Sequence, residues 1–159
     1  FIMIEQIYTY FTIEIIYLWL NIGVLPFWFV LVFFPHTKIC KIFVTSIFPL
    51  TILAFTYLFL VFEIFKTSFS LIDSFNLYLG INELLYLFNE KNFLILFWIH
   101  FIGINLFCGS WIVKDYERIY IPKFLVIIPL LITYFCGPLG IFIYWIIRIF
   151  FNKKITLYD

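Results

Sequence analysis

The sequence predicts an all-α integral membrane protein, a bundle of four kinked transmembrane helices with one amphipathic helix in the membrane interface. Hydrophobic residues make up 65% of the 159 residues, charged residues make up 12%, and the mean hydropathy is +1.13. A soluble domain of this size leaves much of its surface in water, so it cannot hide so much apolar surface. The charge-free runs are also long enough to cross a bilayer, which requires about 20 apolar residues.

Four charge-free runs are the predicted spans, and together they are expected to form a single membrane domain over residues 1–159. The runs cover residues 15–35, 42–62, 92–113 and 124–147. Each is about 30 Å or longer as a helix at 1.5 Å per residue. The runs lack the alternation of polar and apolar residues that marks barrel strands, so helices are predicted.

Prolines within the spans predict the kinks. They are Pro26, Pro49, Pro129 and Pro138. A proline removes a backbone N–H and bends a helix, and a nearby hydroxyl can satisfy the freed carbonyl group. Thr45 and Thr133 are the candidate hydroxyl donors.

Residues 70–88 are predicted to lie in the membrane interface. The polar residues of this segment recur at steps of three and four, which places them on one helical face: Asp73, Asn76, Gly80 and Glu83. A charge at the centre of a bilayer costs about 2.5–3.5 kcal/mol. An interfacial amphipathic helix is therefore favoured, and a fifth span is the alternative.

The basic residues do not orient four spans in the membrane. Five Lys and Arg residues fall on each side, so neither side has the excess of positive charge that marks the cytoplasm. The most polar connection, residues 114–123, carries Asp115, Glu117 and Arg118. Their spacing predicts local charge pairing, which contributes little at a surface.

The amino-acid usage predicts an AT-rich coding genome. Ala54 is the single alanine, whereas Phe and Tyr, which have AT-rich codons, occur 24 and 11 times. No basic segment precedes the first apolar run, which argues against a cleavable targeting peptide. The three cysteines are odd in number and widely spaced, so they are predicted to be buried small hydrophobes. These features favour an organelle-encoded mitochondrial protein over a nuclear product of an AT-rich microbe.

His100 and Asn105 are the polar residues deepest within a predicted span, and such residues are candidate functional groups. A five-residue separation turns them about 140° apart on a helix, so they do not share a face. The other histidine, His36, lies in a predicted loop, and the sequence contains no nucleophile–base pair or phosphate loop. No catalytic residue, metal ligand or cofactor is predicted, and a net charge of +1 argues against nucleic-acid binding.

The second half of the chain contains, in order, a Trp-x-His segment, Asn-Leu-Phe-Cys-Gly-Ser-Trp, an Ile-Pro loop and Thr-Tyr-Phe-Cys-Gly-Pro-Leu-Gly. The motif residues are Trp98, His100, Asn105, Gly109, Trp111, Pro122, Gly137, Pro138 and Gly140. The first half agrees more loosely, for example at Pro26 and Trp28. Over residues 20–150 the pattern resembles the neoxanthin-synthase-like (abscisic-acid-deficient-four-like) family of plants, algae and bacteria. The resemblance implies a four-span fold and, in plants, a link to xanthophyll formation.

Two positions depart from the family pattern. Asn105 stands where the family has Asp, and Ser110 stands where it has Arg. In the family these two charges are candidates for substrate contact or for a pair along the helix. Losing both avoids leaving one buried charge without a partner. The departures therefore favour a protein that keeps the fold without the chemistry.

The preferred hypothesis is a non-catalytic structural or assembly subunit of a respiratory complex in the mitochondrial inner membrane. Its partners are expected to be other subunits and membrane lipids, anionic lipids included, with headgroup contacts at Arg148, Lys153 and Lys154. The first alternative, which the family resemblance implies, is a carotenoid- or lipid-modifying membrane enzyme. The second is a small membrane carrier, which the scarcity of polar residues for a pore disfavours.

Overall fold

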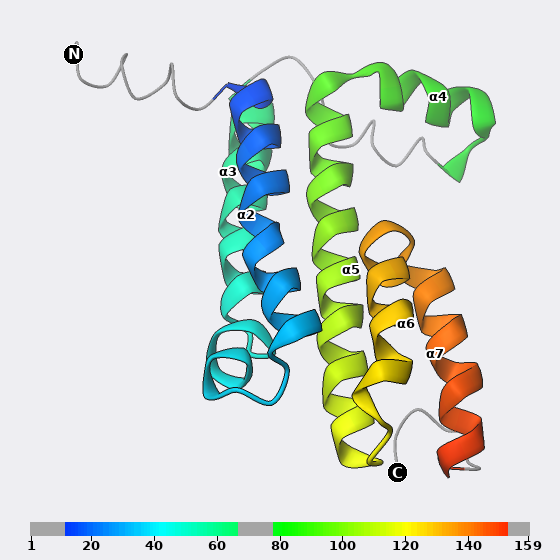
Figure 1. Ribbon diagram of the computed structural model, residues 1–159. Coiled ribbons are helices and arrows are strands. Elements are labelled where there is room, and N and C mark those ends of the chain that lie inside the picture. The colour runs from blue at the N-terminus through cyan, green and yellow to red at the C-terminus, as the bar shows by residue number, and fades with distance from the viewer. Residues whose placement is uncertain (1–11, 67–77, 153–159) are drawn as a thin grey trace. The chain divides into compact units, whose positions relative to one another are not determined.

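The computed structural model describes residues 12–66 and 78–152, in which helices alternate with short connections. These residues form six α-helices and one π-helical turn and include no strand (Figure 1). The all-α fold predicted from the sequence is confirmed for this part of the chain.

Three helical segments in the described part of the chain are long and apolar enough to cross a bilayer. They are α2 (Ile13–Phe33), the segment Cys40–Lys66, and α5 (Lys91–Arg118). With 21 residues, α2 is about 31 Å long, which matches the roughly 30 Å of a hydrocarbon core. The predicted spans that begin at residues 15, 42 and 92 therefore coincide with helices that can span a membrane.

The second of these segments is interrupted before its proline. It begins with the π-helical turn η1 (Cys40–Val44) and continues, after a short break, as α3 (Phe48–Lys66). Thr45 closes the turn, because its backbone N–H donates to Cys40 O at 2.8 Å. Pro49 lies in the first turn of α3, where the missing N–H costs no helical hydrogen bond. The proline thus starts a helix here instead of bending one.

The fourth predicted span, residues 124–147, is two helices. α6 (Lys123–Phe135) and α7 (Gly137–Asn152) are separated by Cys136, which leaves the helical conformation at φ −143° and ψ 82°. The two helices pack side by side and run in opposite directions (Figure 1). Their 13 and 16 residues extend about 20 and 24 Å, less than the roughly 30 Å of a hydrocarbon core. The prediction of a single kinked helix over 124–147 is wrong, because α6 ends before Cys136 and Pro138 lies in the first turn of a new helix that reverses the chain.

A short helix, α4 (Ile81–Asn89), precedes α5. It is amphipathic, with Leu87 buried, and it lies across the end of α5 instead of alongside it (Figure 1). The helix coincides with the second part of the interfacial segment predicted over 70–88. Asp73 and Asn76 lie outside the described residues. The interfacial location itself stays a prediction.

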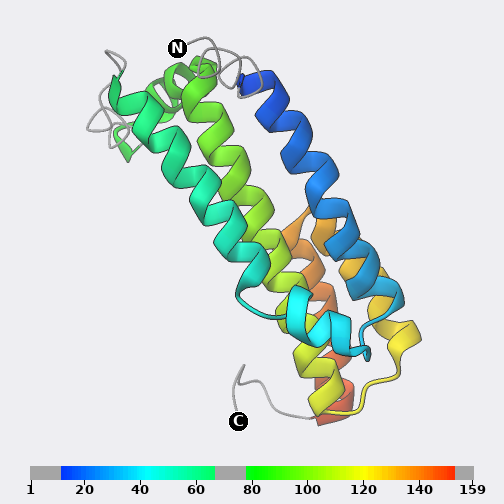
Figure 2. The same ribbon diagram turned by 90° about the vertical axis from the view of Figure 1, so that its left-hand side faces the viewer.

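The described residues group into two compact units. The first unit contains Phe1–Val24 and Thr51–Phe101, and the second contains Leu25–Leu50 and Ile102–Asp159. The start of α2, most of α3, α4 and the start of α5 belong to the first unit, where α2, α3 and α5 run side by side (Figure 2). The remainder of α2 and α5, with η1, α6 and α7, belongs to the second. The single domain predicted over 1–159 stays a prediction.

The second unit has a well-filled core and an apolar exterior. Leu106, Ile112 and Val126 are completely or almost completely buried in it. On its outer surface Phe124 and Phe135 expose most of their side chains. Exposed phenylalanines are costly in water but not against lipid tails, which are as apolar as the side chains themselves. This surface is therefore consistent with a membrane environment.

Candidate functional site

Asn105 connects α5 to the break between α6 and α7. The residue is 3% exposed, and its Nδ2 donates a hydrogen bond to Tyr134 O at 3.2 Å. Tyr134 lies in the last turn of α6, where main-chain carbonyl groups lack helical partners. The amide can approach because residue 137 is glycine, since a Cβ on Gly137 would collide with Asn105 Oδ1. Asn105 therefore satisfies a carbonyl group that the helix break leaves available inside an apolar environment.

Ser110 likewise donates to a main-chain carbonyl group at the second helix interruption, which lies between η1 and α3. Its Oγ donates to Val44 O at 3.4 Å, and Val44 is the last residue of η1. Asn105 and Ser110 are about 140° apart around α5, and they contact different neighbours. The alternative that these two positions pair along the helix does not fit this geometry. Both departures from the family pattern are donors to main-chain carbonyl groups where helices are interrupted.

Gly109 lies between these two residues and receives the indole ring of Trp28. A Cβ at this position would lie 2.7 Å from Trp28 Cη2. Trp28 is buried and packs edge-on against Tyr134, with ring centroids 5.4 Å apart. The two parts of the sequence pattern, one on α2 and one on α5 and α6, therefore meet in the second unit.

Gly140 allows α7 to lie directly against α6. A Cβ here would lie 2.6 Å from Thr133 Cα, closer than real side chains approach a backbone. Thr133 is fully buried, and its hydroxyl group donates to Pro129 O at 2.7 Å within α6. Small residues are a usual means of bringing helices together in lipid. The Gly-Pro-Leu-Gly motif thus forms the close packing of the α6–α7 hairpin.

A buried charged cluster joins α5 to α7. Asp115 Oδ2 accepts hydrogen bonds from Arg148 Nε at 2.7 Å and from Tyr144 Oη at 2.8 Å. Asp115 Oδ1 accepts a third from Arg118 Nη2 at 2.7 Å. Arg148 and Tyr144 are 0% exposed and Asp115 is 4% exposed, so these charges interact in a low dielectric. Trp111 covers the cluster edge-on to Tyr144, with ring centroids 5.7 Å apart.

The structure places Arg148 elsewhere than the sequence predicts. Its guanidinium group is fully buried against Asp115, so it does not contact lipid headgroups. The local pair between Asp115 and Arg118 is present, but the carboxylate is buried and the pair is not a surface pair. Arg148 is the one charged residue within residues 124–152. A lone charge in an apolar segment is usually paired inside the protein, and that signal could have identified it.

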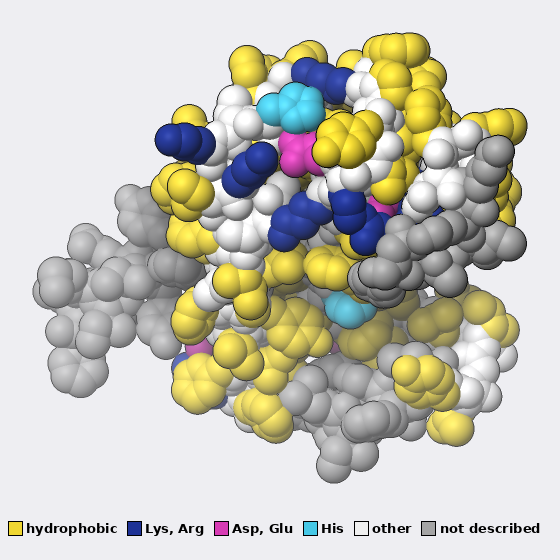
Figure 3. All heavy atoms as spheres, turned by 90° about the horizontal axis from the view of Figure 1, so that it is seen from below, with side chains coloured by type: hydrophobic (Ala, Val, Ile, Leu, Met, Phe, Trp, Pro, Cys, Tyr) yellow, Lys and Arg dark blue, Asp and Glu magenta, His cyan; other side chains and the backbone are white. Residues whose placement is uncertain are grey.

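At one end of the second unit, Lys, Arg, His and acidic side chains gather on the surface (Figure 3). Glu117 lies 2.8 Å from His36 Nδ1 and 3.9 Å from Lys41 Nζ. The His36 ring also packs edge-on against Tyr116, with centroids 5.9 Å apart. Lys123 Nζ donates to the last carbonyl group of α2 at 2.7 Å. The His36 and Lys41 side chains are largely exposed, so these pairs contribute little stability.

The remaining motif residues take structural positions. Trp98 and His100 lie in the first unit, where Trp98 lines an apolar pocket and His100 is exposed on α5. Pro122 is the residue before α6, and Pro138 lies in the first turn of α7. The two tail lysines predicted to contact headgroups lie outside the described residues.

The second unit contains a frame of helices joined by side-chain hydrogen bonds at the positions where helices are interrupted. Among the described residues, no group of three or more His, Cys, Asp or Glu side chains is placed to hold a metal ion. The acceptor atoms of Asp115 are occupied by donors from α5 and α7. The polar residues thus hold the helices together, while the lipid-facing surface stays apolar and aromatic.

Comparison with known proteins identifies a family for this chain. The family model described as ABA DEFICIENT 4-like matches residues 15–144, more than half of the chain. Comparison with curated proteins and with solved structures gave no match.

Proposed function

This chain belongs to the ABA DEFICIENT 4-like family, and from that premise we propose that it acts on a carotenoid within the bilayer, in xanthophyll formation. The match over residues 15–144 carries the proposal, because it includes α2 to α6 and the first half of α7. The packing of Trp28 on Gly109 and of Asn105 against Gly137 supports it, since these motif residues form one frame.

The family match corrects two predictions. A respiratory-complex subunit and a mitochondrial inner-membrane location are both wrong, because the family is one of plastid membrane proteins linked to carotenoids. The error came from the AT-rich residue usage, which reports the base content of a genome and not the membrane in which its product resides. Protein partners stay a prediction.

We propose a topology of three spans followed by a re-entrant hairpin, in place of four spans. α2, Cys40–Lys66 and α5 cross the membrane, and α6 and α7 enter and leave on one side. The lengths of α6 and α7 support this topology, since neither reaches across the hydrocarbon. The membrane side on which α6 begins and α7 ends is called the hairpin side below.

In this topology the Lys and Arg residues are no longer divided equally between the two sides of the membrane. Of the eight Lys and Arg residues that the structure describes, six fall at or near helix ends on the hairpin side, namely Lys38, Lys41, Lys114, Arg118, Lys123 and Arg148. Lys66 and Lys91 remain on the opposite side. Because basic residues concentrate on the side from which a protein inserts, the hairpin side corresponds to the plastid stroma or the cytoplasm.

Cysteine labelling tests the topology. Single cysteines replace Tyr120, Asp159 and Asn89 in a chain whose native cysteines are serine, and sealed vesicles are treated with a membrane-impermeant maleimide. We expect positions 120 and 159 to react from one side and position 89 from the other. Four continuous spans would instead place position 159 with position 89.

Pigment analysis tests the function. The chain is produced in bacterial cells engineered to accumulate xanthophylls, and extracted pigments are separated by chromatography. We expect a pigment that vector-only cells lack, and retention of a carotenoid by the purified protein. An unchanged pigment profile together with a colourless protein would contradict the proposal.

A further inference from the structure

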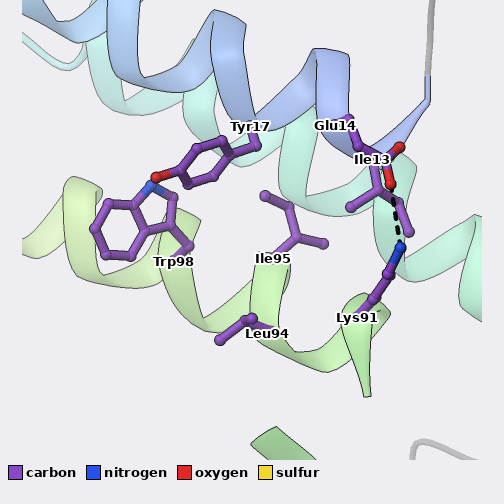
Figure 4. A pocket seen from close by; sticks show the side chains of 7 residues that line it. All are labelled: Ile13, Glu14, Tyr17, Lys91, Leu94, Ile95 and Trp98. Atoms are coloured by element: carbon purple, nitrogen blue, oxygen red, sulfur yellow. Dashed lines mark hydrogen bonds and ion pairs between the residues drawn. The ribbon is translucent and has the colours of Figure 1, made fainter. Parts of the chain in front are cut away.

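A pocket of about 440 Å³ lies in the first unit, between the N-terminal turns of α2 and α5 (Figure 4). Small-molecule sites usually have volumes of about 300–1,000 Å³ and mostly apolar walls. The lining residues are Ile13, Glu14, Tyr17, Lys91, Leu94, Ile95 and Trp98. On α5 the lining extends from Lys91 to Trp98, about 10 Å along the helix. The pocket therefore has a polar end and an aromatic end.

The polar end is electrically neutral. Glu14 Oε1 and Lys91 Nζ are 3.3 Å apart, and their side chains are 70% and 76% exposed. Each charge compensates the other, so this end offers no net attraction to a phosphate or to an ammonium group. A hydroxyl group can bond to either partner without disturbing the charge balance. The ion pair thus favours an uncharged polar ligand.

The aromatic end contains a hydrogen-bond donor without a partner. The Nε1 atom of Trp98 is buried, and no described residue accepts a hydrogen bond from it. The indole ring is held in place by stacking on Phe101, with centroids 5.3 Å apart, and by Tyr17, with centroids 5.9 Å apart. Figure 4 shows the nitrogen edge of the indole facing the hydroxyl end of the Tyr17 side chain. A buried donor of this kind loses a hydrogen bond that a ligand oxygen atom would restore.

We infer that this pocket holds the oxygen-bearing end ring of a carotenoid, with the Trp98 Nε1–H group donating to an oxygen atom of the ligand. The inference rests on the proposed function and assigns it a binding site. The flat faces of Tyr17 and Trp98 suit a rigid ring and the first conjugated bonds of a polyene. A plain acyl chain offers the indole no acceptor, and a phospholipid brings a charge that the neutral end does not select.

A pair of carotenoids tests the inference on the full chain in lipid nanodiscs. Zeaxanthin carries a hydroxyl group on each end ring, whereas β-carotene has the same polyene and no oxygen. We expect the wild type to bind zeaxanthin more tightly, by about threefold to tenfold, the value of one hydrogen bond. Trp98→Phe should remove this preference and leave β-carotene affinity unchanged, and Leu94→Trp, which fills the pocket from a partly exposed position, should weaken both.

Trp145→Phe is the matched control, because Trp145 also stacks on a phenylalanine three residues away and does not line the pocket. We expect this variant to bind both carotenoids like the wild type. Equal zeaxanthin binding by Trp98→Phe, Trp145→Phe and wild type would overturn the pocket assignment and leave the proposed function intact. A wild type that binds neither carotenoid would overturn both. Retention of a phospholipid that zeaxanthin does not displace from the pocket would overturn the assigned ligand.

Discussion

Replacing Arg148 by methionine tests whether the buried cluster stabilises the second unit. Methionine keeps an unbranched chain and removes the charge. The Arg148 Nε to Asp115 Oδ2 hydrogen bond, at 2.7 Å, is lost, and Asp115 keeps only Tyr144 and Arg118, whose side chain is 44% exposed. Removing one partner of a buried ion pair costs about 3–5 kcal/mol. Because Arg118 still compensates the carboxylate in part, we expect a loss of about 3 kcal/mol.

The measurement is the free energy of unfolding in mixed detergent micelles, followed by tryptophan fluorescence during titration with sodium dodecyl sulfate. Lys114→Met is the matched control, since Lys114 is an exposed cation on α5 and its loss should cost less than about 0.5 kcal/mol. The double variant Asp115→Leu/Arg148→Met should be less destabilised than the sum of its single variants, because it leaves no buried charge on either side of the pair. Equal stability of Arg148→Met and Lys114→Met would refute the reasoning.

Four further substitutions test the packing of the helices and their polar contacts. Gly140→Ala places a Cβ against the α6 backbone and should destabilise the hairpin by about 1–3 kcal/mol, whereas Gly23→Ala, with nothing within 4 Å of the added Cβ, should stabilise α2 by about 0.5–1 kcal/mol in the same titration. Asn105→Ala removes a donor to an α6 carbonyl and should cost about 0.6 kcal/mol, the average for hydrogen bonds in membranes. His36→Ala removes the contact between the His36 imidazole, whose side chain is 63% exposed, and Glu117 Oε1, and it should change the unfolding free energy by less than about 1 kcal/mol; a larger loss would show that this contact stabilises the fold more than an exposed polar contact does.

The sequence predicts the three long helical segments well, because hydropathy directly measures the apolar character that a membrane-spanning helix needs. An apolar run of about 20 residues reports both the helix and its environment, and α2 and α5 begin within two residues of the predicted spans. The run over 124–147 is different, since one long helix and two short ones bury the same side chains in the same apolar surroundings. Hydropathy cannot separate these cases, and the reversal depends on Cys136 and on the proline that follows Gly137.

The candidate site was harder to predict because its contacts join residues far apart in the chain. Asp115 and Arg148 are 33 positions apart, and no periodicity relates them. The role of Asn105 also could not be predicted, because its hydrogen-bond acceptor is the main-chain carbonyl group of Tyr134 at a helix end, 29 positions away. The unpartnered indole nitrogen of Trp98 likewise exists only in the packed structure. Periodicity places residues on helix faces, but it does not say which faces meet.

The short helices of the hairpin set an order for biogenesis. In the proposed topology neither α6 nor α7 crosses the membrane, so we expect the two to enter lipid as a pair after α5 is in place. An arginine alone within a helix costs about 2.5–3.5 kcal/mol to insert. Because Arg148 is synthesised after Asp115, it can pair with a carboxylate that is already in place near the end of α5. The Asp115 carboxylate thus binds the final helix in its place. A chain truncated before Arg148 would lack the ion pair that stabilises this last packing step.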